Sequence, residues 1–122
     1  MKGRTKYFSR KVEKDGMIFD SAKEWRRWLV LKAMEESGEI SHLERQREFE
    51  LIPEQREPDT IGPKGGVHRG RLLERRVVYR SDFSYMKDFD LVVEDAKGFR
   101  TEAYIIKRKL MLQVHGIQVK EV

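Results

Sequence analysis

The chain has 122 residues, of which 39% are hydrophobic and 39% charged, and its formal net charge is +5. This length suits one domain with a modest core, and the share of apolar residues excludes a disordered chain. The absence of cysteine excludes disulfides and thiolate metal sites, while the basic balance favours phosphate-bearing partners. A basic protein without a nucleic-acid role would have the same composition.

The N-terminal residues 1–11 are basic and contain no apolar run. We expect a flexible basic arm or an edge strand there, and no secretory signal. No stretch is long and apolar enough to cross a membrane, which predicts a cytoplasmic protein with no membrane partner. Next, Asp15-Gly16 precedes the apolar run 17–19, and this dipeptide is typical of a tight hairpin turn.

Residues 21–38 have the spacing of a helix that ends at Gly38. Its expected buried face consists of Trp25, Trp28, Leu29 and Ala33. Ser21 and Glu24 match a capping box, in which the glutamate accepts a hydrogen bond from the backbone N–H of the cap residue.

An extended run follows from residue 40 to Pro53. Three of its apolar residues share one parity, which predicts one buried face: Leu43, Phe49 and Leu51. Residues 53–70 contain all three prolines and a cluster of glycines, so we expect a mobile loop or a long hairpin tip there.

Residues 76–86 predict one strand, because its apolar side chains alternate: Val77, Tyr79, Phe83 and Tyr85. Asp82 lies on the opposite parity. Residues 87–90 predict a short reversal, after which the strand 91–97 pairs with the preceding one as an antiparallel hairpin.

Residues 101–114 predict a second helix that Gly116 ends. Its expected buried face consists of Ala103, Ile106, Leu110 and Val114. A short strand at 117–122 then requires a right-handed crossover and lies parallel to 91–97. The chain is thus expected to be one α/β domain, residues 1–122, with a mixed sheet of an antiparallel meander plus one parallel strand, flanked by helices.

The strand 91–97 carries a charged group within an apolar run. Side chains alternate along a strand, so Asp95 and Lys97 share one face and Glu94 lies on the other. Asp82, on the neighbouring strand, comes close if the register allows it. Two carboxylates beside a lysine suit Mg²⁺, which can activate water for phosphodiester cleavage. A solvent-facing ion pair is the structural alternative, although desolvation makes such a pair costly on an apolar strand.

The segments "SDF" and "EDAKG", placed between two helices, resemble the PD-(D/E)XK nuclease superfamily. The resemblance implies a restriction-endonuclease-like core. It also implies that Asp82 and Asp95 bind the metal, and that Lys97 positions or activates the attacking water. Many members add a glutamate from the first core helix, and Glu24 matches that position, so Glu24 is a ligand, a helix cap or both. The chain departs from the superfamily pattern at Ser81, where proline is usual, and at Asp95, where glutamate is commoner.

More narrowly, the chain is similar to a family of small phage proteins related to junction-resolving endonucleases. This implies a Mg²⁺-dependent DNA endonuclease, with Mn²⁺ able to substitute, that acts on branched DNA in phage recombination or replication, in the host cytoplasm. Two-strand cleavage would require a homodimer. The alternatives are a non-catalytic DNA-binding or phage-assembly protein that retains the fold, and a nuclease subunit that needs a partner.

Basic residues outside this group are candidate DNA contacts or solvated charges: Lys107, Arg108, Lys6 and Arg10. Gln46 is expected to be exposed unless it approaches the site. The three histidines lack metal-ligand spacing, which argues against a zinc site.

Overall fold

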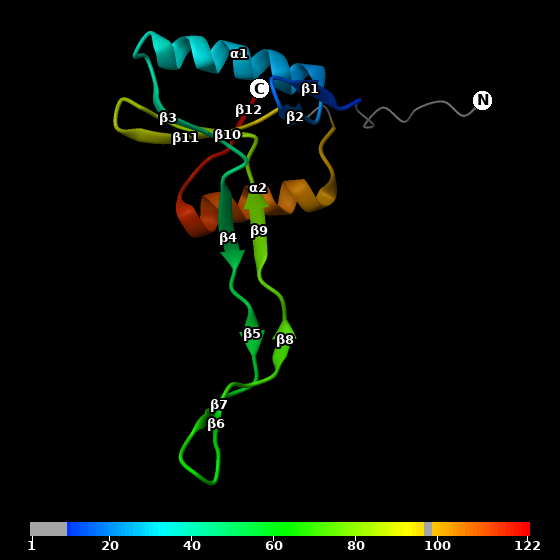
Figure 1. Cartoon of the computed structure of the whole chain (residues 1–122), viewed down its shortest axis with the longest axis vertical. Helices are drawn as coiled ribbons and strands as arrows, with labels where there is room; N and C mark the ends of the chain where they lie inside the picture. The colour runs from blue at the N-terminus through cyan, green and yellow to red at the C-terminus, as the bar shows by residue number, and fades with distance from the viewer. Residues whose placement is uncertain (1–9, 97–98) are drawn as a thin grey trace, which may run out of the picture.

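A mixed four-stranded sheet, with a helix packed against each face, forms the body of the protein in the computed structural model (Figure 1). The structure describes residues 10–96 and 99–122. The expected α/β class, with two helices and one parallel strand pair, is confirmed.

The first hairpin joins β1 (Val12–Lys14) to β2 (Met17–Phe19). Its turn residues both have positive φ, 51° at Asp15 and 78° at Gly16. Such angles suit a two-residue turn that matches the twist of the flanking strands. The hairpin predicted from this dipeptide is therefore confirmed.

Helix α1 (Ala22–Glu36) begins after the cap residue Ser21 and is followed by Gly38, whose φ is 82°. Leu31 is its fully buried apolar residue, and Trp28 and Met34 pack beside it. The predicted face was wrong in part, because Leu29 and Ala33 are exposed. Apolar residues occur almost all round this helix, so spacing alone does not select the side that the sheet covers.

Two segments that were each expected to form one strand are each divided into two, and the two interruptions lie opposite each other. The run 40–53 divides into β3 (Ser41–Arg45) and β4 (Glu48–Ile52), and the run 76–86 into β9 (Val77–Arg80) and β10 (Phe83–Lys87). Strand β3 pairs with β10, whereas β4 pairs with β9 in a separate two-stranded sheet. At this ribbon break the two segments remain hydrogen-bonded to each other, because the N–H of Gln46 donates to the carbonyl of Asp82 at 3.2 Å.

The break changes which face each side chain occupies, so the expectation of continuous parity was wrong. Leu43, Phe83 and Tyr85 pack in the cluster under α1. Phe49, Leu51 and Tyr79 pack instead against the second helix. The paired segments change direction at the break. Odd-numbered residues before and after it therefore pack in different hydrophobic clusters.

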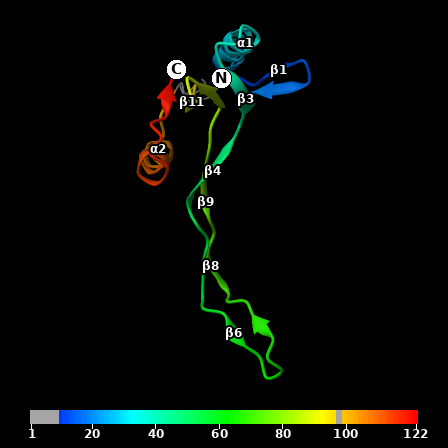
Figure 2. The same ribbon diagram turned by 90° about the vertical axis from the view of Figure 1, so that its left-hand side faces the viewer.

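Beyond this bent ribbon, residues 53–76 form a narrow arm that projects from the body (Figures 1 and 2). Its paired strands are β5 (Gln55–Arg56) with β8 (Leu72–Glu74), and β6 (Thr60–Ile61) with β7 (Val67–His68). Of the two expected forms of segment 53–70, the structure has the long hairpin tip.

Strand β11 (Asp90–Asp95) pairs antiparallel with β10 across a turn at Asp88 and Phe89. Helix α2 (Glu102–His115) ends at Gly116 and leads to β12 (Lys120–Glu121), which pairs parallel with β11. The resulting strand order is β12-β11-β10-β3. The predicted hairpin, helix and parallel crossover are confirmed, with a shorter last strand than expected.

The expected buried face of α2 was wrong in part: Leu110 packs against the core, whereas Ala103, Ile106 and Val114 are exposed. Tyr104 and Met111 are buried against Val93, Tyr79 and the other residues of that cluster. Ile106 and Val114, from the predicted face, are 58% and 49% exposed. The helix therefore has a second apolar stripe, and only packing on the sheet distinguishes the two. Within the described part of the chain, neither helix is long and apolar enough to cross a membrane.

Candidate functional site

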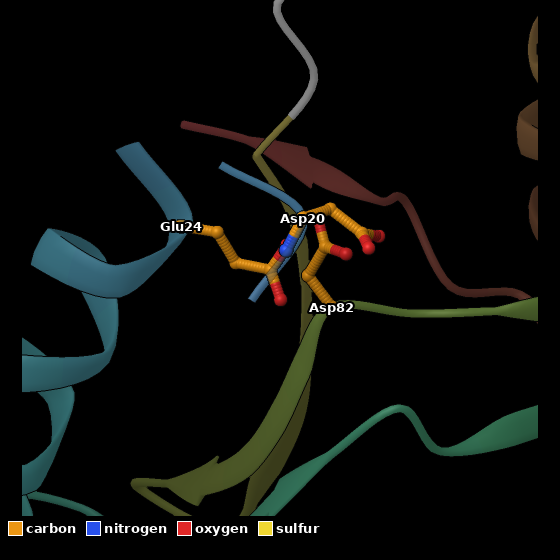
Figure 3. A group of neighbouring side chains, drawn as sticks. All are labelled: Asp20, Glu24 and Asp82. Carbon is orange, nitrogen blue, oxygen red and sulfur yellow. The ribbon is translucent and has the colours of Figure 1, made fainter. Parts of the chain in front are cut away.

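Three carboxylates from separate segments converge at one end of the sheet. Asp20 follows β2, Glu24 lies in the first turn of α1, and Asp82 lies between β9 and β10. One ligand oxygen from each lies within 4.8 Å of the other two. Figure 3 shows the three side chains pointing toward one another. Of the predicted ligands, Glu24 and Asp82 are therefore brought together, and Asp20 joins them.

The start of α1 explains why Asp20 and Glu24 meet. The Ser21 side chain accepts a hydrogen bond from the Glu24 N–H at 3.1 Å and thereby caps the helix. Glu24 Oε2 accepts from the N–H of Asp20 at 3.3 Å, rather than from Ser21 as the capping box predicts. This bond turns the Glu24 side chain back toward Asp20, the residue before the helix cap. Glu24 therefore supports the helix start and faces the carboxylate group at once.

The ribbon break explains the position of Asp82. Its backbone N–H donates to the carbonyl of Glu94 at 3.1 Å. Its side-chain Oδ2 accepts from the N–H of Ala96 at 2.7 Å. Asp82 is thus attached by backbone and side chain to the end of β11, where the remaining predicted site residues lie.

Burial and like charge act together on Glu24. The residue is 2% exposed, and desolvation, followed by the charges of Asp82 and Asp20, raises its pKa to about 7. Within the described residues, its Oε1 accepts no hydrogen bond, and Arg45 Nη2 lies 3.7 Å away. The neighbouring carboxylates thus disfavour the charged form of Glu24, and a cation bound among them would relieve this repulsion.

The two acids at the end of β11 point to opposite faces, as alternation predicts. Asp95 is fully buried, and its Oδ2 accepts from the Tyr79 hydroxyl at 2.6 Å. Burial, together with this hydrogen bond, raises the pKa of Tyr79. Asp95 is not a member of the three-carboxylate group. Lys97, the predicted catalytic lysine, lies outside the described residues.

A cleft of about 630 Å³ opens beside the carboxylates and includes Asp20 and Asp82 in its lining. Three cationic side chains line the same cleft: Lys11, Arg45 and Arg80. Gln46 also lines it, so this residue does approach the site. Anionic ligand groups would meet positive charge on the cleft wall and negative charge at the carboxylates.

Asp20 and Arg80 were missed from the sequence. A signal for Asp20 was present, since the residue before a helix cap lies near the third helical residue, here Glu24. Arg80 had no such signal, because it reaches the cleft only through the ribbon break.

The predicted DNA contacts are dispersed. Arg108 donates to Glu121 Oε2 at 3.2 Å, and Lys107 is half-buried beside it on α2. Arg10 is exposed just before β1, near the cleft residue Lys11. Lys6 lies outside the described residues.

Comparison with known proteins adds one relationship. No curated protein and no solved structure matches the chain. One family, described as "Protein of unknown function (DUF1064)", matches residues 4–121. The match spans the carboxylate group, the ribbon break, the arm and both helices, so the chain belongs to this family.

Proposed function

We propose that this protein is a metal-dependent DNA endonuclease that hydrolyses phosphodiester bonds. The observation that carries the proposal is the convergence of Asp20, Glu24 and Asp82 within 4.8 Å beside a cleft with a cationic wall. Glu24 is the buried member of the three, and its charged form is costly beside two other carboxylates unless a cation joins them. A phosphate-bearing substrate would suit the arginines and lysine of the cleft.

The donor set fits Mg²⁺ or Mn²⁺, because both prefer hard oxygen ligands. Glu24, Asp82 and Asp20 would hold the ion, and the buried Glu24 Oε1 already lacks a hydrogen bond from the described residues. When bound, such an ion activates water and offsets the charge that builds up on the phosphate.

The other residues of the proposed site act on the substrate or on their neighbours. Arg80 and Lys11 would hold the DNA phosphates in the cleft. Lys97, which follows Asp95 by two residues, would position the attacking water. Asp95 would orient this end of β11 through its hydrogen bond from Tyr79, unless a change in the Tyr79 side chain frees it as a ligand.

The proposal includes a restriction-endonuclease-like core and branched DNA as the substrate. The succession of α1, the antiparallel strands β3, β10 and β11, then α2 and the parallel strand β12 supports this core. The described residues form one small body on a four-stranded sheet, with a hairpin arm, so recognition would depend on backbone charge and DNA shape rather than on a separate base-reading domain. A homodimer would be required to cut both strands.

A non-catalytic DNA-binding protein is the second candidate, and the burial of Asp95 favours it. Asp95 is fully buried and accepts a hydrogen bond from Tyr79, and this arrangement stabilises the fold without any need for catalysis. The two candidates differ in whether DNA is cleaved, and not in whether it is bound.

The test is cleavage of a four-way junction and a linear duplex by the purified protein with Mg²⁺ or Mn²⁺. We expect cleavage of the junction by wild type, and a loss of about 100-fold or more in Asp82→Asn and Lys97→Ala. Glu36→Gln, an exposed change on α1, is the matched control. DNA binding without metal-dependent cleavage would support the non-catalytic candidate, and activity that appears only when a partner protein is added would identify a subunit.

A further inference from the structure

Glu94 forms a buried ionic link between α1 and β11 that the proposed chemistry does not use. It is fully buried, and Arg27 binds it with two hydrogen bonds, from Nε to Oε1 at 2.8 Å and from Nη2 to Oε2 at 2.6 Å. The Tyr85 hydroxyl also donates to Oε2. Lys120 Nζ lies farther away, 4.0 Å from Oε2.

Stability alone does not account for this link. Apolar residues of similar size often replace a buried ion pair at no cost in stability, because the desolvation of both charges offsets their attraction. The surroundings of Glu94 are apolar, since Val92, Phe83 and Tyr85 pack in the cluster under α1. Stability therefore does not explain why the charged pair Arg27 and Glu94 occupies this position.

The position of the link supplies that reason. Arg27 follows Glu24 by three residues, so both lie on one side of the first turns of α1. Glu94 also accepts the backbone N–H of Asp82 through its own carbonyl. One residue thus bonds to the helix that carries Glu24 and to the backbone of Asp82.

The apolar contacts of α1 hold the helix on the sheet without defining its position as closely. Trp28 stacks on Phe83 with 6.0 Å between ring centroids, and Leu31 is buried beside them. Such contacts are non-directional. The two-pronged bond between a guanidinium and a carboxylate is directional and defines both distance and orientation.

We propose that Glu94 is a positioning residue, which sets α1 against the end of β11 through Arg27 and thereby sets the spacing of Glu24 and Asp82. The effect of Glu94 on catalysis rests on the proposed function. The spacing itself is a property of the fold and is measurable without metal or DNA.

The test compares three variants that lose different parts of this arrangement. Glu94→Gln removes the negative charge and leaves one acceptor oxygen for the two Arg27 donors, so the two-pronged bond is lost. Tyr85→Phe removes one donor and keeps the link. Leu31→Val weakens the apolar packing of α1 and leaves every polar contact in place. Each variant is studied by crystallography and by Mn²⁺ titration, at temperatures where circular dichroism shows it folded.

In Glu94→Gln we expect the oxygen separation between Glu24 and Asp82 to exceed its wild-type value, which lies within 4.8 Å. We also expect Mn²⁺ affinity to fall about 10- to 100-fold, as for other residues that orient metal ligands. Tyr85→Phe should lose less affinity, and Leu31→Val should melt at a lower temperature while binding Mn²⁺ as wild type does. If Glu94→Gln fails to fold, Arg27→Lys, which keeps the charge and loses the two-pronged bond, takes its place.

Unchanged carboxylate spacing in the folded Glu94→Gln or Arg27→Lys protein would overturn the inference, as would equal losses of affinity in all three variants. A wild-type protein that binds no Mn²⁺ or cuts no DNA would contradict the proposed function instead. The crystallographic spacing would still decide whether Glu94 positions α1.

Discussion

Two buried glutamates, Glu24 on α1 and Glu94 on β11, both lie near the start of α1, and their surroundings differ. Glu94 is surrounded by donors, with Arg27 and Tyr85 bonded to its carboxylate. Glu24 faces two other carboxylates, and burial, followed by their repulsion, raises its pKa to about 7. Burial alone therefore does not identify a functional acid. The difference lies in the nearest neighbours: Glu94 accepts two hydrogen bonds from one guanidinium, whereas Glu24 lies beside two carboxylates and 3.7 Å from Arg45.

The largest expected effect follows from removing the cation that compensates Glu94. Arg27→Met leaves a buried carboxylate without its main partner and should lower the free energy of unfolding by about 3–5 kcal/mol. Denaturant unfolding measures this change. Lys32→Met is the matched control on the same helix, because Lys32 is half-exposed in its pair with Glu35, and it should cost less than about 1 kcal/mol. Equal losses in the two variants would remove the contrast.

Neutralising the other glutamate should have the opposite sign. The folded pKa of Glu24 lies above its ordinary 4.5, so between about pH 4.5 and 7 the native state binds more protons than the unfolded state. The stability that Glu24 contributes is therefore present at acid pH and is lost as pH rises through this window. In metal-free protein near pH 8, Glu24→Gln should raise the free energy of unfolding by about 1–3 kcal/mol.

Unfolding curves of wild type and Glu24→Gln across this pH range measure the effect. The two proteins should converge at acid pH, where Glu24 is protonated in both the folded and the unfolded states. Glu36→Gln, at an exposed position of α1, should follow the wild-type profile. A wild type that gains stability between the two pH limits relative to Glu24→Gln would show that the repulsion is absent.

A divalent ion should relieve the repulsion among the three carboxylates. Mn²⁺ at about one hundred times its dissociation constant should stabilise the wild type by about 2.7 kcal/mol near pH 8, and chelation should reverse this. Near pH 7, binding should release protons from Glu24, which calorimetry in buffers of different ionisation enthalpy detects. Asp82→Asn should lose both effects. Equal stabilisation of wild type and Asp82→Asn would place any bound ion elsewhere.

The smallest effect should come from the distant cation of Glu94. Lys120 lies 4.0 Å from Oε2 and its side chain is 57% exposed, so solvent screens the pair. Lys120→Met should change the free energy of unfolding by less than about 0.5 kcal/mol. A loss as large as that of Arg27→Met would mean that net charge, and not the directional bond, compensates Glu94.

Local patterns were sufficient for much of the fold. The turn at Asp15-Gly16 and the caps Ser21 and Gly116 act within a few residues of themselves, and all three lie where expected. The ribbon break was not foreseen, because Gln46 has a φ of 55° without being glycine. A bond across the ribbon to the carbonyl of Asp82 accompanies this angle. No pattern of neighbouring residues signals a turn that a distant strand stabilises.

The candidate site was likewise predictable from local patterns only in part. Alternation along one strand was enough to separate Glu94 from Asp95, because the period of a strand is local. The meeting of Glu24, Asp82 and Asp20 required a helix start, a hairpin and a ribbon break to be placed together. The donors of Glu94 come from α1 and β10, so its compensation was equally invisible in the chain order.

By itself, the sequence determined the first hairpin, the two helices, the parallel crossover and the opposite faces of Glu94 and Asp95, since these depend on periodicity and short-range capping. Only the tertiary structure decided which stripe of each helix is buried, where the ribbon bends and which acids share a site. Those outcomes depend on contacts between residues far apart in the chain. The contrast between Glu24 and Glu94 is of this second kind: one residue type, equally buried, differs through the partners that the fold brings to it.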